Sequence, residues 1–429
     1  MTDNQPKGFH TRAIHAGAQP DPTTGARVTP IYQTTSYVFK DPEHAARLFG
    51  LQELGFIYSR LTNPTIGVLE ARLADLEGGV GASCTASGHA AQLMTFFALM
   101  SPGDHIVAAK KLYGGTVNQL AVSFPRAFGW QTTFVDTDDL DAVKAAITPK
   151  TKCLFVESLA NPGGIITDMQ ALARIAEDAG IPFIVDNTMA TPYLCRPIEH
   201  GASIVVHSTT KFLSGHGNSV GGAVIDSGKF DWAASGNYPA LAEPDPGYHG
   251  LNFHETFGEL ALTMHGHAVG LRDLGTNQQP MNAFLTITGI ETLPLRMQRH
   301  CDSAQQIAEY LADHPKVDWV QYAGLPQSPY HSLARKYLPK GSGAVFTFGV
   351  TGGYEAGRGV VEQVQLFSHL ANIGDTRSLI IHPASTTHSQ LTPEDRAAAG
   401  AGDDVVRLSI GLEDPDDIIA DLDQALAKV

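Results

Sequence analysis

Short apolar segments alternate with segments of helical periodicity from about residue 65 to residue 225 of this 429-residue chain. The apolar segments end in turn formers or polar residues, as is typical of buried strands in α/β proteins. Helical stretches such as 66–77 and 169–179 separate them. This alternation predicts an α/β fold with a mostly parallel sheet and helices on both faces. The expected strands span residues 105–109, 132–135, 153–156, 183–185, 204–206 and 222–225.

Three regions differ in pattern, and a chain of this length usually forms more than one domain. Residues 1–60 show weak periodicity and many turn formers, so we expect an N-terminal arm. Residues 61–282 form the expected large domain, which includes an irregular insertion, 227–282, rich in glycine, proline, histidine and asparagine. Residues 283–429 are expected to form a smaller α+β domain. Its expected elements are a helix around 290–311, strands at 344–348 and 405–410, and a closing helix at 416–427.

Composition argues against several classes of protein. The formal net charge of −15 disfavours a nucleic-acid partner, which requires clustered lysine and arginine. The longest apolar stretch, 90–100, is interrupted by Gln92 and Thr95 and is too short to cross a bilayer. The first residues lack the apolar core of a secretion signal, and the four cysteines are widely scattered. We therefore expect a cytoplasmic protein with reduced thiols, no membrane partner and no metal site.

A lysine and an aspartate follow two of the expected strands, at the edge where open α/β sheets bind ligands. Asp186 ends one strand, and Lys211 follows another through a run of hydroxyl residues. This pair suits pyridoxal phosphate (PLP), because the amine forms a Schiff base with the aldehyde and the carboxylate keeps the pyridine nitrogen protonated. Ser208 and Thr210 are placed to donate hydrogen bonds to the phosphate. The alternative is a snorkelling surface lysine and a helix-capping aspartate.

Further polar groups follow other expected strands. Ser87 and Gly88 precede a buried helix, whose amino terminus favours anions, although an ordinary helix cap is the alternative. Tyr113 is placed either to stack on a flat heteroaromatic ring or to pack half-buried. Asn161 is placed either to bind the cofactor's ring oxygen or to form an Asn-Pro turn. Because these groups follow strands of one sheet, we expect them to converge on one site.

Motifs along nearly the whole chain resemble those of the Cys/Met-metabolism family of PLP-dependent enzymes, and they occur in the family's order. The resemblance is highly specific. The motifs are Tyr58-Ser59-Arg60, Asn63-Pro64-Thr65, Ser87-Gly88, Tyr113-Gly114, Glu157-Ser158, Asn161-Pro162, Val185-Asp186-Asn187-Thr188, Ser208-Thr209-Thr210-Lys211, His382-Pro383-Ala384-Ser385, Thr387-His388, Arg407-Leu408-Ser409 and Gly411-Leu412-Glu413.

The resemblance implies fold type I of the PLP-dependent transferases, with a seven-stranded sheet and a smaller C-terminal domain. It implies that Lys211 is the catalytic Schiff-base lysine and proton shuttle. Asp186 then pairs with the pyridine nitrogen, Tyr113 stacks on the ring, and Asn161 contacts both cofactor and substrate. The phosphate ligands that the resemblance implies are Ser87, Gly88, His89, Ser208 and Thr210.

The resemblance also implies a partner subunit. Tyr58 and Arg60 resemble the pair that reaches the phosphate of the neighbouring subunit, which implies a catalytic dimer, usually doubled to a homotetramer. Arg407 resembles the arginine that grips the substrate carboxylate in a bidentate fork, with Ser378 beside it. His89 departs from the hydrophobic residue common in the family, although a backbone contact to phosphate tolerates this change.

Within the family, segments 243–250 and 374–379 resemble those of the O-acetylhomoserine sulfhydrylase branch. That branch implies PLP-dependent γ-replacement, in which sulfide or methanethiol replaces the acetyl group of O-acetyl-L-homoserine to give L-homocysteine or L-methionine. One alternative is elimination as in methionine γ-lyase, whose cysteine after the Tyr-Gly pair is Gly115 here. The others are the reactions of cystathionine γ-synthase and O-succinylhomoserine sulfhydrylase.

Other classes of protein fit the sequence less well. The run His254-Glu255-Thr256-Phe257-Gly258 lacks the second histidine of a zinc helix, and Gly215–Val220 lacks the third glycine of a dinucleotide fingerprint. A non-catalytic binding protein has no use for a Schiff-base lysine. We interpret a cluster of histidines in the insertion as loop packing or substrate-channel lining: His249, His254, His265 and His267.

Overall fold

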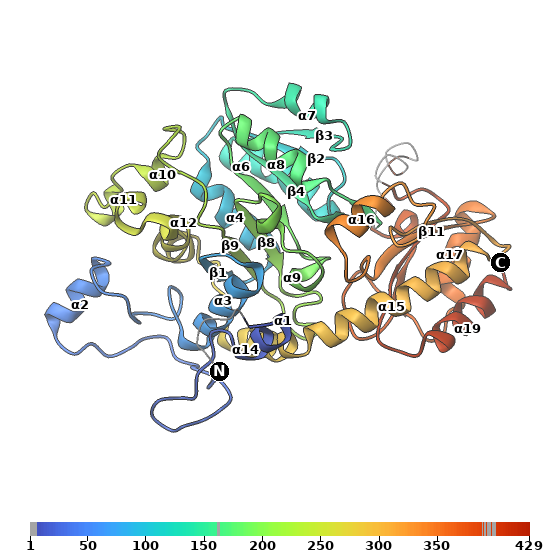
Figure 1. Ribbon diagram of the computed structural model, residues 1–429, viewed down its shortest axis with the longest axis horizontal. Coiled ribbons are helices and arrows are strands. Elements are labelled where there is room, and N and C mark those ends of the chain that lie inside the picture. Colours follow the sequence, from blue (N-terminus) through green and yellow to red (C-terminus); the bar gives the residue numbers. More distant parts are fainter. Residues whose placement is uncertain (1–6, 161–163, 388, 390–391, 393–395, 397–399) are drawn as a thin grey trace.

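The computed structural model describes residues 7–160, 164–387, 389, 392, 396 and 400–429. Figure 1 shows a large α/β domain at the centre, a smaller domain with α17 and α19 on one side, and a segment with α2 on the other. The long helix α15 (Leu293–Ala312) runs from the large domain to the smaller one.

A seven-stranded sheet forms the centre of the large domain, in the order β1-β9-β8-β7-β4-β2-β3. Neighbouring strands from β8 to β3 are parallel, and β9 runs antiparallel to both of its neighbours. The mostly parallel seven-stranded sheet is thus confirmed. Strand β1 is absent from the sequence prediction because it contains a single β-branched residue. The strands are β1 (Gly81–Thr85), β2 (His105–Ala109), β3 (Gln131–Val135), β4 (Thr151–Glu157), β7 (Phe183–Asp186), β8 (Ile204–Ser208) and β9 (Gly222–Asp226).

Helices cover both faces of this sheet. Glu77, the last residue of α3, accepts a hydrogen bond from His207 of β8, whereas Gly88 at the start of α4 packs against Ser208 of the same strand. Because successive strand residues point to opposite faces, α3 and α4 lie on opposite sides. The helices of this region are α3 (Pro64–Glu77), α4 (Gly88–Leu99), α5 (Gly114–Asn118), α6 (Phe124–Phe128), α7 (Leu140–Ala146), α8 (Met169–Asp178), α9 (Thr191–Leu194), α10 (Pro239–Ala242), α11 (Phe253–Phe257), α12 (Ala261–His265), α13 (Arg272–Leu274) and α14 (Pro280–Glu291).

A second sheet, of five strands in the order β10-β11-β14-β13-β12, forms the smaller C-terminal domain. The sequence predicts β11, β14 and the closing helix α19, but not the two shortest strands or β10, whose residues are half-exposed. A hairpin, β5 (Leu159–Ala160) with β6 (Ile165–Ile166), lies outside both sheets. The elements are β10 (Val317–Gln321), α16 (His331–Tyr337), β11 (Val345–Val350), α17 (Gly353–Gln363), β12 (Ser368–His369), β13 (Leu379–Ile381), β14 (Val405–Ser409) and α19 (Pro415–Leu426).

The N-terminal region divides into two parts. Helix α1 (Phe9–His15) packs on α3, α14 and α15 of its own chain. Beyond it, the chain projects from the large domain and carries α2 (Pro42–Phe49) away from the rest of the molecule (Figure 1). This projecting segment exposes large apolar side chains, at 61% for Phe49, 71% for Leu54 and 100% for Val38. Such exposure is typical of a surface that packs against another chain.

Two of the four histidines of the insertion, His265 and His267, pack against other parts of the chain. His265 is buried and stacks edge-on against Phe253. The two ring nitrogens of His267 lie 2.8 Å from the Leu61 carbonyl oxygen and 3.3 Å from that of Ala82. Within the described ranges, no group of three or more histidine, cysteine, aspartate or glutamate side chains is arranged to hold a metal ion. Across the same residues, no helix combines the length and the apolar composition that membrane crossing requires.

The burial of Asp226 in this core predicts how the stability of the protein depends on pH. Burial raises the pKa of Asp226 from 3.8 to about 7, and its Oδ2 has no hydrogen-bond partner among the described residues. The folded chain therefore binds a proton that the unfolded chain releases, so the free energy of unfolding falls as pH rises from 3.8 to about 7. We expect Asp226→Asn to be more stable than wild type near pH 8 and nearly equal near pH 4, by thermal denaturation. Equal stability at both pH values would contradict this.

Candidate active site

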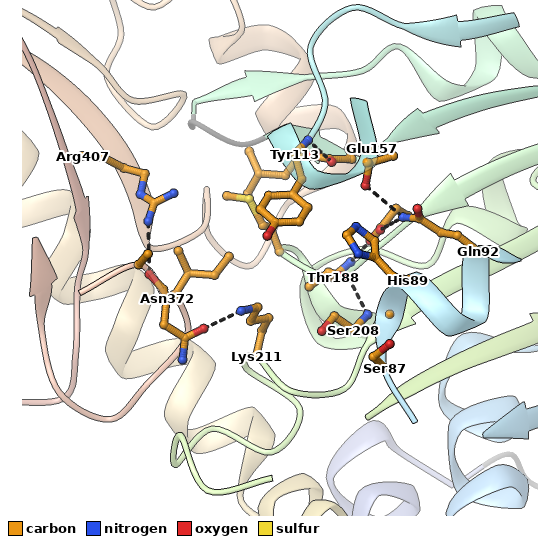
Figure 2. A pocket seen from close by; sticks show the side chains of 17 residues that line it. Ser87, His89, Gln92, Tyr113, Glu157, Thr188, Ser208, Lys211, Asn372 and Arg407 are labelled. Carbon is orange, nitrogen blue, oxygen red and sulfur yellow. Dashed lines mark hydrogen bonds between the residues drawn. The ribbon is translucent and has the colours of Figure 1, made fainter. Parts of the chain in front are cut away.

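A cavity opens at the carboxyl ends of the parallel strands, between the large and the C-terminal domains (Figure 2). Its empty volume, including its mouth, is about 860 Å³. In Figure 2, Arg407 and Asn372 reach toward Lys211 from one side, and His89, Gln92 and Ser208 face them from the other. The lining residues are Ser87, Gly88, His89, Gln92, Tyr113, Thr116, Glu157, Leu159, Asp186, Thr188, Met189, Ser208, Lys211, Ala371, Asn372, Ile373 and Arg407.

Asp186 is held in place at the end of β7 by neighbouring donors. Its Oδ1 accepts the backbone N–H of Thr188 at 2.9 Å, and its Oδ2 accepts from Gln92 Nε2 at 3.4 Å. The Thr188 hydroxyl in turn accepts the backbone N–H of Ser208 at 2.8 Å. Two adjacent strand ends are therefore joined on the cavity side, and the carboxylate faces the cavity.

Lys211 lies in the turn after β8, and its Nζ donates a hydrogen bond to Asn372 Oδ1. Burial, and secondarily the nearby Arg407 cation, lowers the pKa of Lys211 to about 8. Burial likewise lowers the pKa of Arg407 to about 10, and its Nη2 donates to the Asn372 carbonyl oxygen at 3.3 Å. A lysine amine with such a pKa is partly neutral near pH 8 and can act as a nucleophile or base.

The start of α4 forms a small concave surface beside Ser208. Ser87 caps this twelve-residue helix, and its Oγ accepts the backbone N–H of Ala90 at 3.1 Å. A Cβ on Gly88 would lie 2.8 Å from Ser208 Cβ, so this close approach requires glycine. Helix amino termini attract anions, which makes this surface suitable for a phosphate. Thr210 is not among the described lining residues; its hydroxyl exchanges hydrogen bonds with the Gly221 backbone.

Tyr113 stands at the mouth of the cavity with half of its surface exposed. Glu157, at the end of β4, accepts its backbone N–H at 2.6 Å. The ring of His89 lies 5.7 Å from the Tyr113 ring, centroid to centroid, with an interplanar angle of 33°. Burial lowers the pKa of His89, so the imidazole is neutral near pH 7. The two rings therefore form an aromatic wall.

Besides Thr210, three described candidate residues do not line this cavity. Tyr58 and Arg60 are on the projecting segment, where the guanidinium carbon lies 5.2 Å from the ring centroid. Ser378 is buried immediately before β13, where its hydroxyl donates to Glu413 Oε2 at 2.9 Å and accepts the backbone N–H of Gly411 at 2.9 Å. Asn161 lies outside the described residues.

Nine lining residues are absent from the sequence prediction of the site, and three of them, Gln92, Thr188 and Asn372, hydrogen-bond other residues of the cavity. Gln92 has a detectable signal, because it interrupts the apolar stretch of its helix. Thr188 lies two residues after Asp186 and therefore on the same face. Asn372 carries no periodic or motif signal, because it reaches the cavity only through the packing of the C-terminal domain against the large domain.

The donor set fits pyridoxal phosphate. The cavity combines an amine of lowered pKa, a carboxylate fixed by two hydrogen bonds, an aromatic wall and the amino terminus of a helix. These match, in turn, an aldehyde, a pyridine nitrogen, a flat ring and a phosphate.

Comparison with known proteins agrees with this chemistry. Residues 10–427 match the family of Cys/Met metabolism PLP-dependent enzymes, and the chain belongs to that family. PLP is therefore its cofactor. The chain is 48% identical to the O-acetyl-L-homoserine sulfhydrylase of Leptospira meyeri, over 100% of this chain and 99% of that protein.

Two further relatives are similar over almost their full lengths. The chain is 50% identical to the homocysteine synthase of Schizosaccharomyces pombe, over 97% of this chain and 98% of that protein. The crystal structure of a putative O-acetylhomoserine (thiol)-lyase from Campylobacter jejuni superimposes with a TM-score of 0.95 at 42% identity, over 98% of this chain and 100% of that one. That structure contains N'-pyridoxyl-lysine-5'-monophosphate.

A substitution at Gly115 tests whether the aromatic wall of Tyr113 and His89 contributes to PLP binding. A Cβ at this position would lie 2.5 Å from Tyr113 Cε1 and 2.8 Å from His89 Cε1, so a ring must move. We expect Gly115→Ala to weaken PLP binding a few-fold, since an aromatic pair contributes about 0.5–1.5 kcal/mol. Fluorescence titration of the apoprotein measures this. Gly67→Ala is the control, because nothing lies within 4 Å of its added Cβ. Identical PLP affinity in both variants would refute the role of the wall.

Proposed function

We propose that this chain replaces the acetyl group of O-acetyl-L-homoserine with sulfide, or with methanethiol, and releases acetate. The products are L-homocysteine or L-methionine. The observation that carries the proposal is the meeting of Lys211, Asp186 and Arg407 in one cavity. The full-length similarity to proteins named O-acetyl-L-homoserine sulfhydrylase and homocysteine synthase supports the choice of substrates.

The large domain would hold the cofactor. Lys211 would bind its aldehyde carbon, Asp186 its pyridine nitrogen, and Tyr113 would cover its ring. When bound, PLP supplies an electron sink that stabilises negative charge at the substrate's Cα. The phosphate would be bound by the residues around the start of α4 and the end of β8: Ser87, Gly88, His89 and Ser208. Thr210 stays a proposed phosphate ligand, and it would have to give up its hydrogen bonds with the Gly221 backbone to act as one.

Lys211 would then move the protons. Its free amine would take the Cα proton, give that proton up again and then take a Cβ proton, which allows acetate to leave from Cγ, and it would return protons to Cβ and Cα after sulfide has added. A pKa of about 8 suits both the uptake and the return of a proton near neutral pH. Tyr113, at the cavity mouth, would assist the leaving group. Sulfide then adds at Cγ.

The C-terminal domain would orient the substrate. Arg407 would hold the substrate's α-carboxylate in a bidentate fork. Asn372, whose carbonyl oxygen accepts from Arg407, would donate a further hydrogen bond to the same carboxylate through its side-chain amide. We assign Asn372 to this place instead of Ser378, whose hydroxyl bonds Glu413. Asn161 stays a proposed contact to cofactor and substrate.

A second copy of the chain would complete each site. We propose that the segment with Tyr58 and Arg60 reaches the partner's phosphate, and that the exposed apolar residues around α2 form part of the contact between subunits. The catalytic dimer would double to a homotetramer. A cytoplasmic location accords with the four buried, unbridged cysteines.

Product analysis tests the reaction. We expect holoenzyme given O-acetyl-L-homoserine to form homocysteine only when sulfide is present, with little 2-oxobutyrate, as quantified by chromatography. 2-Oxobutyrate as the main product despite sulfide would establish a γ-lyase instead. Parallel assays with O-succinyl-L-homoserine, and with cysteine as acceptor, test the two other activities of the family.

Substitution of Arg407 tests whether its cation helps to lower the pKa of Lys211. The amine must be neutral to attack an aldehyde, so the rate of PLP loading rises with pH through the pKa of Lys211, at about 8. Arg407→Gln removes a nearby cation and should raise that pKa, which moves the rate midpoint to higher pH. Stopped-flow absorbance measures the profile. Arg358→Gln, on the exposed face of α17, should leave the midpoint unchanged. A midpoint in Arg407→Gln that stays or falls contradicts the assignment.

Co-expression tests the shared site. Lys211→Ala and Arg60→Ala chains are each expected to be inactive alone, but a mixed dimer contains one site with neither defect. We expect their co-expression to restore activity. Lys211→Ala with Asp186→Ala is the control, because both defects then lie in the cavity of the chain that carries them. No recovery beyond this control would show that Arg60 serves its own chain.

A further inference from the structure

A buried hydrogen-bond network lies on the opposite side of the sheet from the cavity. Glu77 Oε1 accepts from His207 Nε2 at 2.6 Å and from Asn187 Nδ2 at 2.8 Å. Asn187 Oδ1 in turn accepts the Ser158 hydroxyl at 2.7 Å. All four residues are at most 1% exposed. We call these residues the Glu77 network: Glu77, His207, Asn187 and Ser158.

Apart from Glu77, each residue of the Glu77 network adjoins a residue that lines the cavity. His207 precedes Ser208 on β8, while Asn187 and Ser158 come directly after Asp186 and Glu157, the last residues of β7 and β4. Their backbone N–H groups still bond the neighbouring strand, from Asn187 to Val206 and from Ser158 to Asp186, each at 3.0 Å. Because adjacent strand residues point to opposite faces, the network lies directly behind the cofactor site. It joins the same three strand ends that carry the site's carboxylates and Ser208.

The position of Glu77 is costly for the helix that carries it. Glu77 is the last residue of α3, where the helix dipole disfavours a negative charge. It is also fully buried, and burial of a carboxylate is unfavourable unless donors compensate it. Its Oε2 has no hydrogen-bond partner among the described residues, so compensation comes from the two donors on Oε1. Stability of α3 alone does not explain an acid here.

The network has one consistent orientation. Asn187 Nδ2 can only donate, and both atoms it faces, Glu77 Oε1 and the Cys195 carbonyl oxygen at 2.9 Å, can accept. This orientation leaves Asn187 Oδ1 as the acceptor for the Ser158 hydroxyl. Among the described residues Glu77 Oε2 and His207 Nδ1 have no partner, and the three hydrogen bonds among the four side chains are what tie their elements together.

We propose that Glu77 is a positioning residue for the cofactor site. Through its network it fixes the carboxyl ends of β4, β7 and β8 relative to one another. The backbone of Asp186 and Ser208 is thereby held where pyridine nitrogen and phosphate are bound. This inference rests on the proposed cofactor site and concerns residues that never touch the cofactor.

The test compares PLP dissociation constants and the pH midpoint of the visible absorption of bound PLP. We expect Glu77→Ala to weaken PLP binding roughly tenfold and to shift the midpoint. An effect of this size is typical when a residue is lost that holds the direct ligand-binding groups in place. Glu77→Gln keeps an acceptor oxygen for both donors, and its amide nitrogen takes the place of the unpartnered Oε2. It should therefore restore both values to within about twofold of wild type.

Ser158→Ala is the milder variant, which tests the proposal even if Glu77→Ala does not fold. It removes one buried hydrogen bond at the carboxyl end of β4, and a few-fold loss of PLP affinity is expected. Tyr238→Phe is its matched control, because it removes a buried hydroxyl-to-carbonyl bond, to Lys152, near the amino end of the same strand. It should lower the melting temperature but leave PLP affinity unchanged.

Folded Glu77→Ala or Ser158→Ala protein with wild-type PLP affinity and midpoint would overturn the proposal. An equal loss of affinity in Tyr238→Phe would also overturn it, because general destabilisation would then explain the effect. Wild-type protein that binds no PLP would refute the proposed function together with this inference, so the two failures are distinguishable.

Discussion

The alternation of side chains along β4, β7 and β8 is the constraint on which the site depends. At each strand end, one residue faces the cavity and its neighbour faces the buried side of the sheet. A one-residue slip in register would exchange Asp186 with Asn187, and the carboxylate would leave the cavity. The parallel pairing of β7 with β4 and β8 therefore determines the chemistry as well as the fold.

The cavity brings two cations together in a chain that is acidic as a whole, and balances them with the carboxylates of Asp186 and Glu157. The protein carries a formal net charge of −15, yet Lys211 and Arg407 lie together in the cavity, and each has a lowered pKa. Burial and mutual repulsion keep the lysine amine partly neutral, while the arginine stays charged to hold a carboxylate. Lys211 can therefore act as nucleophile and base, while Arg407 binds the substrate's carboxylate.

The sequence predicted the elements that periodicity and motif order determine. Six strands of the large sheet, and Lys211 with Asp186 at their ends, follow from buried runs that stop at polar residues. Asn372 and the buried position of Ser378 could not be predicted, because they depend on how the C-terminal domain packs. Glu77 is separated from His207 by 130 residues, and only the folded sheet brings them together.

Identification of the lysine that carries the cofactor tests the role of Lys211. Reduction of the yellow protein with borohydride fixes the pyridoxyl group to that lysine, and peptide mass spectrometry locates it. We expect one modified peptide, which contains Lys211. A pyridoxyl group on any other lysine, or an unmodified Lys211 in fully reduced protein, would contradict this role.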